Sequence, residues 1–141
     1  MYSKEVHLVI DALLVLFGVL GALSRYSLSL IIHVPYHFPL ATLIINLLGC
    51  FILAFVTRFL IWIPRVSPKL VAVFGTGFVG SFTTFSTFSL ESFALIQSNH
   101  YLEAAIYLLL SGFGGLAASA LGFRLSKILL IKQRRRLRHA D

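Results

Sequence analysis

Four long apolar segments separated by short polar stretches dominate the sequence. They cover about residues 6–32, 40–63, 69–97 and 101–131. Each is at least as long as the roughly 20 residues that an α-helix needs to cross a bilayer. Within them, polar residues do not recur at the helical or strand period that a soluble fold requires. The pattern predicts an all-α membrane protein with four transmembrane helices in a single domain, residues 1–141.

The composition strengthens this prediction. Hydrophobic residues make up 58% of the chain and charged residues 12%, and the mean hydropathy is +0.92, which lies far outside the usage of soluble domains. No small-residue cleavage pattern follows the first segment, so we expect it to stay in the protein. Cys50 is the single cysteine and lies in an apolar run, which excludes a disulfide framework and predicts a buried packing role.

The basic residues are gathered at one end of the predicted helices. Eleven of the twelve Lys and Arg residues precede the first segment, flank the second gap, or lie at the end of the fourth segment and in a basic tail of about residues 132–141. Arg25 is the exception. Basic residues in short loops stay cytoplasmic, so both termini are predicted on the cytoplasmic side of the cell membrane, with the tail as a topology signal instead of a nucleic-acid site. An enzyme is not expected, because no nucleophile, base and orienting group recur together.

The stretch from Gly75 to Ser89 is the least regular part of the apolar segments. Its crowded glycines and hydroxyl residues favour a helix break at membrane depth, which is tolerated only where the freed backbone groups are buried in protein or line a wet cavity. A continuous helix with Ser and Thr bonded back to its own carbonyls is the alternative. Phe85 and Phe88 share one helical face. Their positive ring edges can coordinate a small anion, although lipid contact or core packing fits the spacing as well.

Other polar residues lie inside the apolar segments. Asn46, in the middle of the second segment, should face protein or a pore. Glu91 lies one turn beyond Phe88 and fits either a functional site or a structural ion pair. Tyr107 and Ser111 are spaced i,i+4 and present two hydroxyls on one stripe, for a pore or for hydrogen bonds between helices. Glycines and alanines form faces of small residues on the first and fourth segments, and such faces predict close helix packing.

Three motifs in this order and spacing resemble the CrcB/Fluc fluoride channels. They run over residues 21–26 (GALSRY), 39–46 (PLATLIIN) and 80–91 (GSFTTFSTFSLE). The Thr-Thr-Phe-Ser-Thr-Phe element is the specific one, and the resemblance covers essentially the whole chain. It implies an antiparallel dimer of two subunits with two pores that conduct fluoride passively, and one central sodium ion as a structural element that is not transported.

The resemblance also implies roles for individual residues. The fluoride pore is expected to include Asn46, Phe85, Phe88, Ser86, Thr87, Tyr107 and Ser111. Arg25 matches a vestibule arginine, and Gly80 and Thr83 match residues whose backbone carbonyls hold sodium. Two positions depart from the family pattern: Ala41 and Ser81 each stand where glycine is usual.

The charge bias carries a separate prediction about assembly. Identical chains can form an antiparallel dimer only if each is inserted in both orientations, which requires a weak charge bias. Because the bias of this chain is strong, we expect a heterodimer with a homologue of opposite orientation.

Two other functions fit four apolar helices. One is a small proton-coupled multidrug-type transporter, for which Asp11 in the first segment is the candidate proton site. The other is a non-conducting partner subunit of a channel heterodimer. The sequence favours the channel, because Asp11 lies too near the end of its helix.

Overall fold

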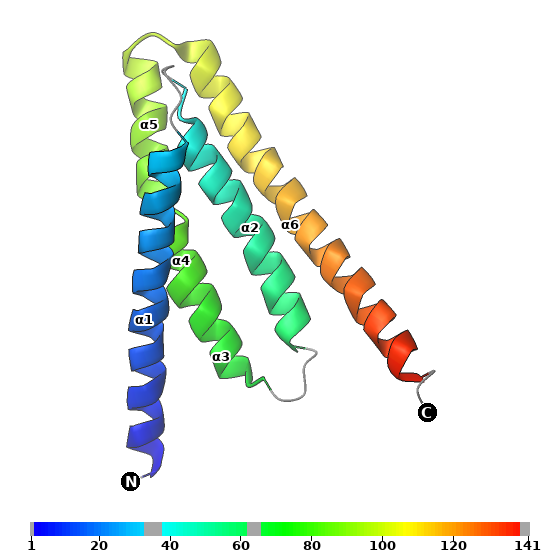
Figure 1. The fold of residues 1–141 in the computed structure, drawn as a ribbon. Helices are drawn as coiled ribbons and strands as arrows, with labels where there is room; N and C mark the ends of the chain where they lie inside the picture. The colour runs from blue at the N-terminus through cyan, green and yellow to red at the C-terminus, as the bar shows by residue number, and fades with distance from the viewer. Residues whose placement is uncertain (1, 33–37, 62–65, 139–141) are drawn as a thin grey trace.

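The computed structural model describes residues 2–32, 38–61 and 66–138, and these residues form helices joined by short turns. Four helical segments are long and apolar enough to cross a membrane, which confirms that prediction; they are His7–Ile31, Leu40–Leu60, Pro68–Gln97 and Tyr101–Lys132. Both ends of the described chain lie at the same, lower end of Figure 1. Four spans are an even number of membrane crossings, so both ends of the described chain must lie on the same side.

Three of the four spans are single helices, and their bounds lie close to the predicted ones. They are α1 (Tyr2–Ile31), α2 (Leu40–Ile61) and α6 (Tyr101–Arg138). α6 is longer than predicted and continues through most of the segment expected to form a tail, because the residues after Lys132 include no glycine or proline and are mostly good helix formers. The predicted end of the second helix at residue 63 and the last three residues of the tail lie outside the described residues.

The third span consists of several pieces. Ser67 accepts a hydrogen bond from the Leu70 amide and begins α3 (Pro68–Val73). A π-helix, η1 (Phe74–Val79), and the short α4 (Gly80–Phe82) follow. Thr83 and Thr84 have extended backbones, with ψ angles of 160° and 119°, and α5 (Phe85–Gln97) begins after them.

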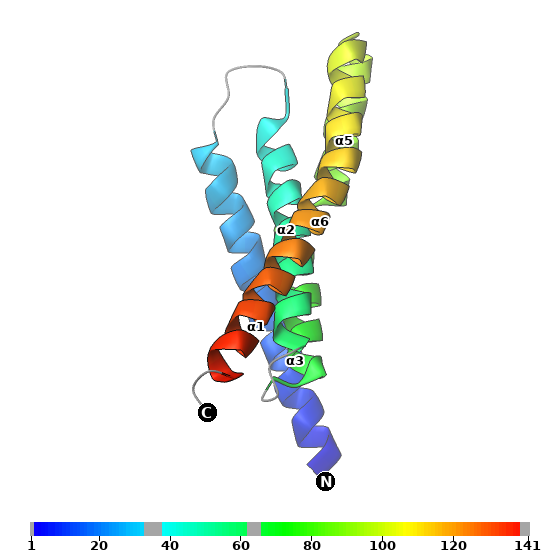
Figure 2. The ribbon, with the colours of Figure 1, turned by 90° about the vertical axis from the view of Figure 1, so that its right-hand side faces the viewer.

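The third span changes neighbours along its length. Below Thr83, α3, η1 and α4 pack between α1 and α2, whereas α5 packs against α6 and α2. α2 therefore lies at the centre, with α1 on one side and α6 on the other (Figures 1 and 2). α5 and α6 are joined by a tight turn in which Asn99 adopts a positive φ of 62°. The His100 amide bonds to the Leu95 carbonyl, and the Asn99 amide to that of Ile96, as in a Schellman motif.

Glycines allow the closest helix approaches. A Cβ atom on Gly21 of α1 would collide with the carbonyl of Phe78 in η1, and one on Gly77 would lie 2.9 Å from the carbonyl oxygen of Leu14. On the other side of the molecule, Gly122 of α6 meets the backbone of Phe51 in α2. The prediction of small packing faces is confirmed at Gly21 and Gly122. Close van der Waals contact is the main source of helix association in lipid.

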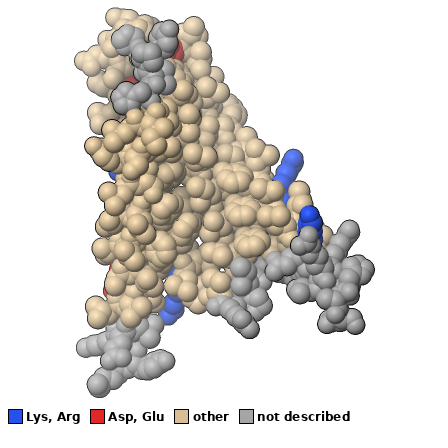
Figure 3. Space-filling view, in the orientation of Figure 1, with Lys and Arg blue, Asp and Glu red and all other residues tan. Residues whose placement is uncertain are grey.

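The single chain leaves most of its apolar surface uncovered. Between 6% and 28% of the residues in each span window are buried within the chain. Among the described residues, the face in Figure 3 shows few charged side chains, and Lys and Arg appear mainly toward its lower part. In a membrane, surrounding lipid can cover such a surface.

Replacement of Gly21 by alanine should destabilise the protein by about 1–3 kcal/mol, because the new methyl group meets backbone that cannot move away like a side chain. The measurement is thermal stability of the purified protein, followed by size-exclusion chromatography after heating. Gly18→Ala on the same helix is the control, since its Cβ would meet the nearest atom at an ordinary 3.5 Å. Equal stability of the two variants would contradict the packing role of Gly21.

Candidate functional site

The irregular stretch between α4 and α5 is held by its own threonines. The amide and the hydroxyl of Thr83 both donate to the Val79 carbonyl, each at 2.9 Å, and so close the last turn of α4. The Thr84 hydroxyl oxygen accepts from the Thr87 amide at 3.2 Å and caps α5. The Thr84 hydroxyl also donates to the Thr87 hydroxyl at 2.9 Å and lies 3.3 Å from that of Ser86. The hydroxyl residues of this run therefore satisfy backbone groups at a helix end.

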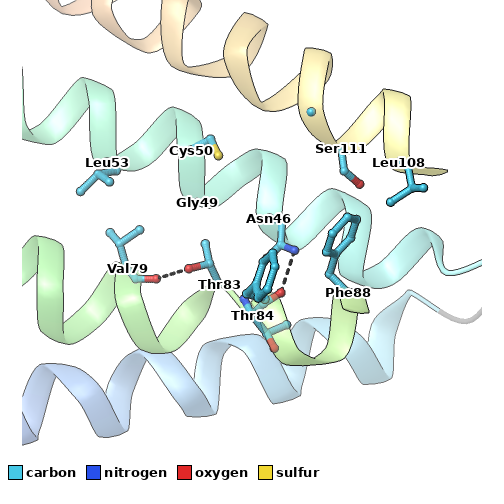
Figure 4. A pocket seen from close by; sticks show the side chains of 12 residues that line it. Asn46, Gly49, Cys50, Leu53, Val79, Thr83, Thr84, Phe88, Leu108 and Ser111 are labelled. Carbon is cyan, nitrogen blue, oxygen red and sulfur yellow. Dashed lines mark hydrogen bonds between the residues drawn. The ribbon is translucent and has the colours of Figure 1, made fainter. Parts of the chain in front are cut away.

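Asn46 of α2 pairs with the same stretch from the neighbouring helix. Its Nδ2 donates to the Thr84 carbonyl at 3.0 Å, and its Oδ1 accepts from the Thr84 amide at 2.9 Å. One side chain thereby satisfies both backbone polar groups of an extended residue that has no helical partners (Figure 4). The prediction that Asn46 faces protein or a pore is confirmed, since it bonds to protein and also lines a cavity.

These side-chain bonds compete for the amides that would otherwise close two helical hydrogen bonds. The Thr84 amide donates to Asn46 instead of the Gly80 carbonyl, and the Thr87 amide donates to the Thr84 hydroxyl instead of the Thr83 carbonyl. Neither of these two amides therefore closes a helical hydrogen bond to the Gly80 or the Thr83 carbonyl, and irregular backbone of this kind can line an ion site in a membrane protein. The two carbonyls predicted to hold sodium fit that role chemically, because hard cations take oxygen ligands.

A cavity of about 420 Å³ lies beside the irregular stretch. Its lining comes from α2, α6 and the third span: Asn46, Gly49, Cys50, Leu53, Val79, Thr83, Thr84, Phe85, Phe88, Leu108, Ser111 and Gly112. Of the residues predicted for a pore, it brings together Asn46, Phe85, Phe88 and Ser111. The other predicted residues, Ser86, Thr87 and Tyr107, do not line it.

The two phenylalanines of this cavity differ in exposure. The ring centroids of Phe85 and Phe88 lie 5.8 Å apart with planes tilted by 43°. Phe88 also lies 5.2 Å from the Tyr107 ring and packs against the core. The Phe85 side chain, by contrast, is 80% exposed. A large apolar side chain exposed in the middle of a span is available to a second chain.

Tyr107 is fully buried and takes part in a hydrogen-bonded group at Glu91. Its hydroxyl donates to Oε2 of Glu91 at 2.8 Å, and the Thr42 hydroxyl donates to Oε1 at the same distance. In the described residues Glu91 accepts these two hydrogen bonds, and its structural ion pair stays a prediction. Tyr107 bonds between helices, which was one of its two predicted roles. Thr42 was not predicted, although a hydroxyl one turn before Asn46 on the same helix face was a usable signal.

Two further predictions concern residues beside this region. Arg25 of α1 donates from Nε to the Ser81 carbonyl at 3.2 Å, and its vestibule role stays a prediction. Ser81 lies in the helical α4, and Asn99 is the only described non-glycine residue with a positive φ, so the serine meets no backbone strain. Cys50 is half-buried and lines the cavity, which corrects its prediction as a buried packing residue. Asp11 is exposed on α1 and does not contribute to the cavity.

Glycine is also required where α2 meets the irregular stretch. A Cβ atom on Gly49 would collide with the Thr83 side chain. This contact and the bonds of Asn46, one turn earlier on α2, fix the position of the third span against the cavity.

Comparison with known proteins finds a matching family and several relatives. The family model described as "CrcB-like protein, Camphor Resistance (CrcB)" matches residues 12–123. A protein of Bacillus cereus (strain ATCC 10987) named fluoride-specific ion channel FluC 1 is 49% identical over 117 residues, which cover 82% of this chain and 85% of that protein. Another FluC 1, of Desulfitobacterium hafniense, is 50% identical over 76% of this chain and 94% of its own length.

A third relative carries a different number in its name. The fluoride-specific ion channel FluC 2 of Listeria monocytogenes is 48% identical over 114 residues, which cover 81% of this chain and 88% of that protein. The match of the family model over most of the chain, together with relatives near 50% identity along nearly their whole length, identifies the family. The chain belongs to the CrcB family, the CrcB-like proteins.

Proposed function

We propose that this chain is a subunit of a fluoride-specific channel through which fluoride leaves the cell passively. The observation that carries the proposal is the cavity in which the amide of Asn46, the hydroxyl of Ser111 and the rings of Phe85 and Phe88 meet. Relatives named fluoride-specific ion channels support the same function. Passive efflux limits fluoride toxicity without an energy source.

The chemistry of the cavity suits a small, strongly hydrated anion. A narrow pore must replace the water that fluoride loses with hydrogen-bond donors and positive ring edges. Asn46 uses one N–H of its Nδ2 on the Thr84 carbonyl, and an amide nitrogen carries a second. Ser111 supplies a hydroxyl donor. The described residues that line the cavity include no Asp or Glu, so no carboxylate repels the anion there.

An antiparallel dimer would complete the site. The exposed ring of Phe85 and the cavity beside it both remain open in the single chain. A second subunit that covers them would bury an aromatic side chain and narrow the cavity to a pore. We infer that the fluoride path lies between subunits, with Ser86, Thr87 and Tyr107 near it and Arg25 raising the local anion concentration at its entrance.

The carbonyls of Gly80 and Thr83 are the proposed sodium ligands. Both have lost their helical amide partners to Asn46 and to the Thr84 hydroxyl. When bound, sodium supplies a positive charge that offsets the partial negative charges of these carbonyls. In an antiparallel dimer, carbonyls of both subunits could bind one sodium ion, which would join the two irregular stretches.

The charge distribution supports a partner of opposite orientation. Eleven of the twelve Lys and Arg residues lie on one side of the predicted membrane, which directs both termini to the cytoplasm of the cell. Relatives numbered FluC 1 and FluC 2 support the existence of paired homologues. The multidrug-type transporter is disfavoured because Asp11, its candidate proton site, lies outside the cavity. A non-conducting role for this subunit is the remaining alternative.

Fluoride efflux from proteoliposomes tests the function and the partner together. We expect fluoride-selective efflux, with chloride as the control anion, when the chain is produced with an oppositely oriented homologue, and little efflux from the chain alone. Fluoride efflux from the chain alone would support the channel function and reject the obligate heterodimer. If neither preparation released fluoride, that result would contradict the proposed function.

Replacement of Asn46 by aspartate should lower fluoride efflux about 10- to 100-fold, because it removes an amide donor and adds a negative charge beside the anion path. The Oδ1 acceptor for the Thr84 amide is retained, which limits damage to the fold. Cys50→Ala, a neutral change in the same cavity, is the control and should keep nearly full efflux. Undiminished flux in a well-folded Asn46→Asp channel would exclude this amide from the path.

Removal of sodium provides a test of the cation site. Exchange of sodium for N-methylglucamine should destabilise the assembled dimer by about 2–3 kcal/mol, if sodium was present at roughly 100 times its Kd. The loss should be visible as a lower melting temperature and reversed by sodium but not by the larger organic cation. A melting temperature that is independent of sodium would argue against coordination by Gly80 and Thr83.

A further inference from the structure

A second cavity lies between α2 and the lower part of the third span. Its volume is about 400 Å³, and its lining includes Leu53 and Thr57 of α2 and residues from Pro68 to Thr76 of the third span. Pro68 begins the third span at the end of the molecule where the termini lie (Figure 1). This lower cavity therefore extends from that membrane surface toward the cavity that contains Asn46, which we call the upper cavity.

The two cavities follow the same face of α2. The residues of α2 that line them are Asn46, Gly49, Cys50, Leu53 and Thr57. Residues three or four positions apart lie on one side of a helix, so these residues form one continuous stripe. Figure 4 shows the upper part of this stripe, from Asn46 to Leu53, with Val79 and Thr83 opposite it.

The third span presents a matching stripe. Its lining residues follow one another about one helical turn apart at Pro68, Ala72, Thr76, Val79 and Thr83. The first three line the lower cavity, and the last two line the upper cavity. The cavities are therefore two parts of one groove between α2 and the third span, which runs from the membrane surface to the irregular stretch at Thr84.

Leu53 divides this groove. It is the one described residue that lines both cavities. Its side chain reaches from α2 to η1, because a Cβ atom on Gly75 would lie 3.1 Å from Cδ1 of Leu53. The Leu53 side chain is 40% exposed, so in the single chain the groove stays open on its outer side. A second subunit over that side would leave Leu53 as an apolar wall between the two parts.

The two parts of the groove differ in what they offer an anion. In the upper cavity, the amide of Asn46, the hydroxyl of Ser111 and ring edges can replace the water around fluoride. The described residues that line the lower cavity are uncharged and mostly apolar, and the Thr57 hydroxyl donates to the Leu53 carbonyl at 2.5 Å. The volume of the lower cavity and the hydroxyl oxygens of Thr57 and Thr76 provide room and polar partners for water. The lower cavity therefore suits an ion that keeps its water.

We propose that water in the lower cavity forms the lower part of the fluoride path, and that Leu53 is the constriction at which fluoride passes into the upper cavity. An apolar constriction limits the passage of an ion by its width and by its resistance to wetting. Lys69 follows Pro68 and is exposed, so it adds positive charge near the mouth of the lower cavity, which favours the arrival of an anion. The role of Leu53 rests on the proposed channel function.

Cysteine labelling tests for water in the lower cavity and does not require conduction. Thr76→Cys and Val15→Cys are each made in the full-length Cys50→Ala protein, which is assembled with a partner that lacks cysteine. A membrane-impermeant methanethiosulfonate reagent is added on the side of the termini, and it reacts with the thiolate, which forms in water and not in lipid. We expect Thr76→Cys to be labelled about tenfold faster than Val15→Cys, because only the first thiol would face water.

Val15 is the control that matches Thr76 in depth. A Cβ atom on Gly77 would lie 2.9 Å from the carbonyl oxygen of Leu14, so their direct neighbours in the chain, Thr76 and Val15, lie at nearly the same depth. Val15 is 66% exposed on α1. Absence of labelling at both positions would mean that lipid or the partner subunit fills the lower cavity, and it would overturn the water-filled path. Equal labelling of both would overturn it too, because the reagent would then reach any exposed residue at this depth.

Fluoride efflux from proteoliposomes tests the constriction itself. Leu53→Ala widens the groove and should raise efflux about threefold, whereas the larger side chain in Leu53→Phe should lower efflux about fivefold. Leu48→Ala is the matched control, because Leu48 is 41% exposed, lies on the same helix and lines neither cavity. Its efflux should stay within about twofold of that of the unchanged protein. All variants are compared as intact assemblies isolated by size-exclusion chromatography.

The outcomes separate the role of Leu53 from the channel function. If the unchanged assembly releases fluoride and both Leu53 variants behave like Leu48→Ala, the constriction is wrong and the channel function stands. If the unchanged assembly releases no fluoride, the proposed function fails and the constriction fails with it. Faster efflux in Leu53→Ala together with slower efflux in Leu53→Phe would support the constriction.

Discussion

The pair of hydrogen bonds between the Asn46 side chain and the backbone of Thr84 is the interaction on which the site depends. In a bilayer, an extended residue has no water to satisfy its amide and carbonyl, so a side chain from a neighbouring helix must do so. Asn46 provides a donor and an acceptor at the right separation. With these bonds in place, the third span changes direction and neighbours, and Phe85 and Phe88 come to line the cavity.

Close contacts at glycines, which have no side chain, hold the helices around the site together. Gly21 and Gly77 bring α1 against η1, Gly49 brings α2 against Thr83, and Gly122 brings α6 against α2. Each contact places backbone next to backbone or next to a short side chain, where dispersion and polar interactions are strongest. Because lipid tails cover exposed apolar residues as well as protein does, specific shape has to supply the stability that the hydrophobic effect supplies in water.

Electrostatics divides the molecule into two regions. The cavity is lined by neutral groups whose dipoles and ring edges can face an anion, whereas the cations are gathered near the ends of α2, α3 and α6. The neutral lining places no carboxylate beside the cavity, and the gathered cations favour one orientation in the membrane. The same chain therefore combines a neutral cavity with charged helix ends.

The sequence alone predicted the four spans, the side on which charge gathers and the family motif, because hydropathy, charge and short motifs are local properties. Four of the residues that it predicted for a pore, Asn46, Phe85, Phe88 and Ser111, line one cavity in the structure. Only the tertiary structure decided that Asn46 bonds to Thr84, that Tyr107 and Thr42 share Glu91, and that Cys50 lines the cavity. These pairs are far apart in the chain, and their distances follow from how closely glycine-bearing helices approach, which no local pattern specifies.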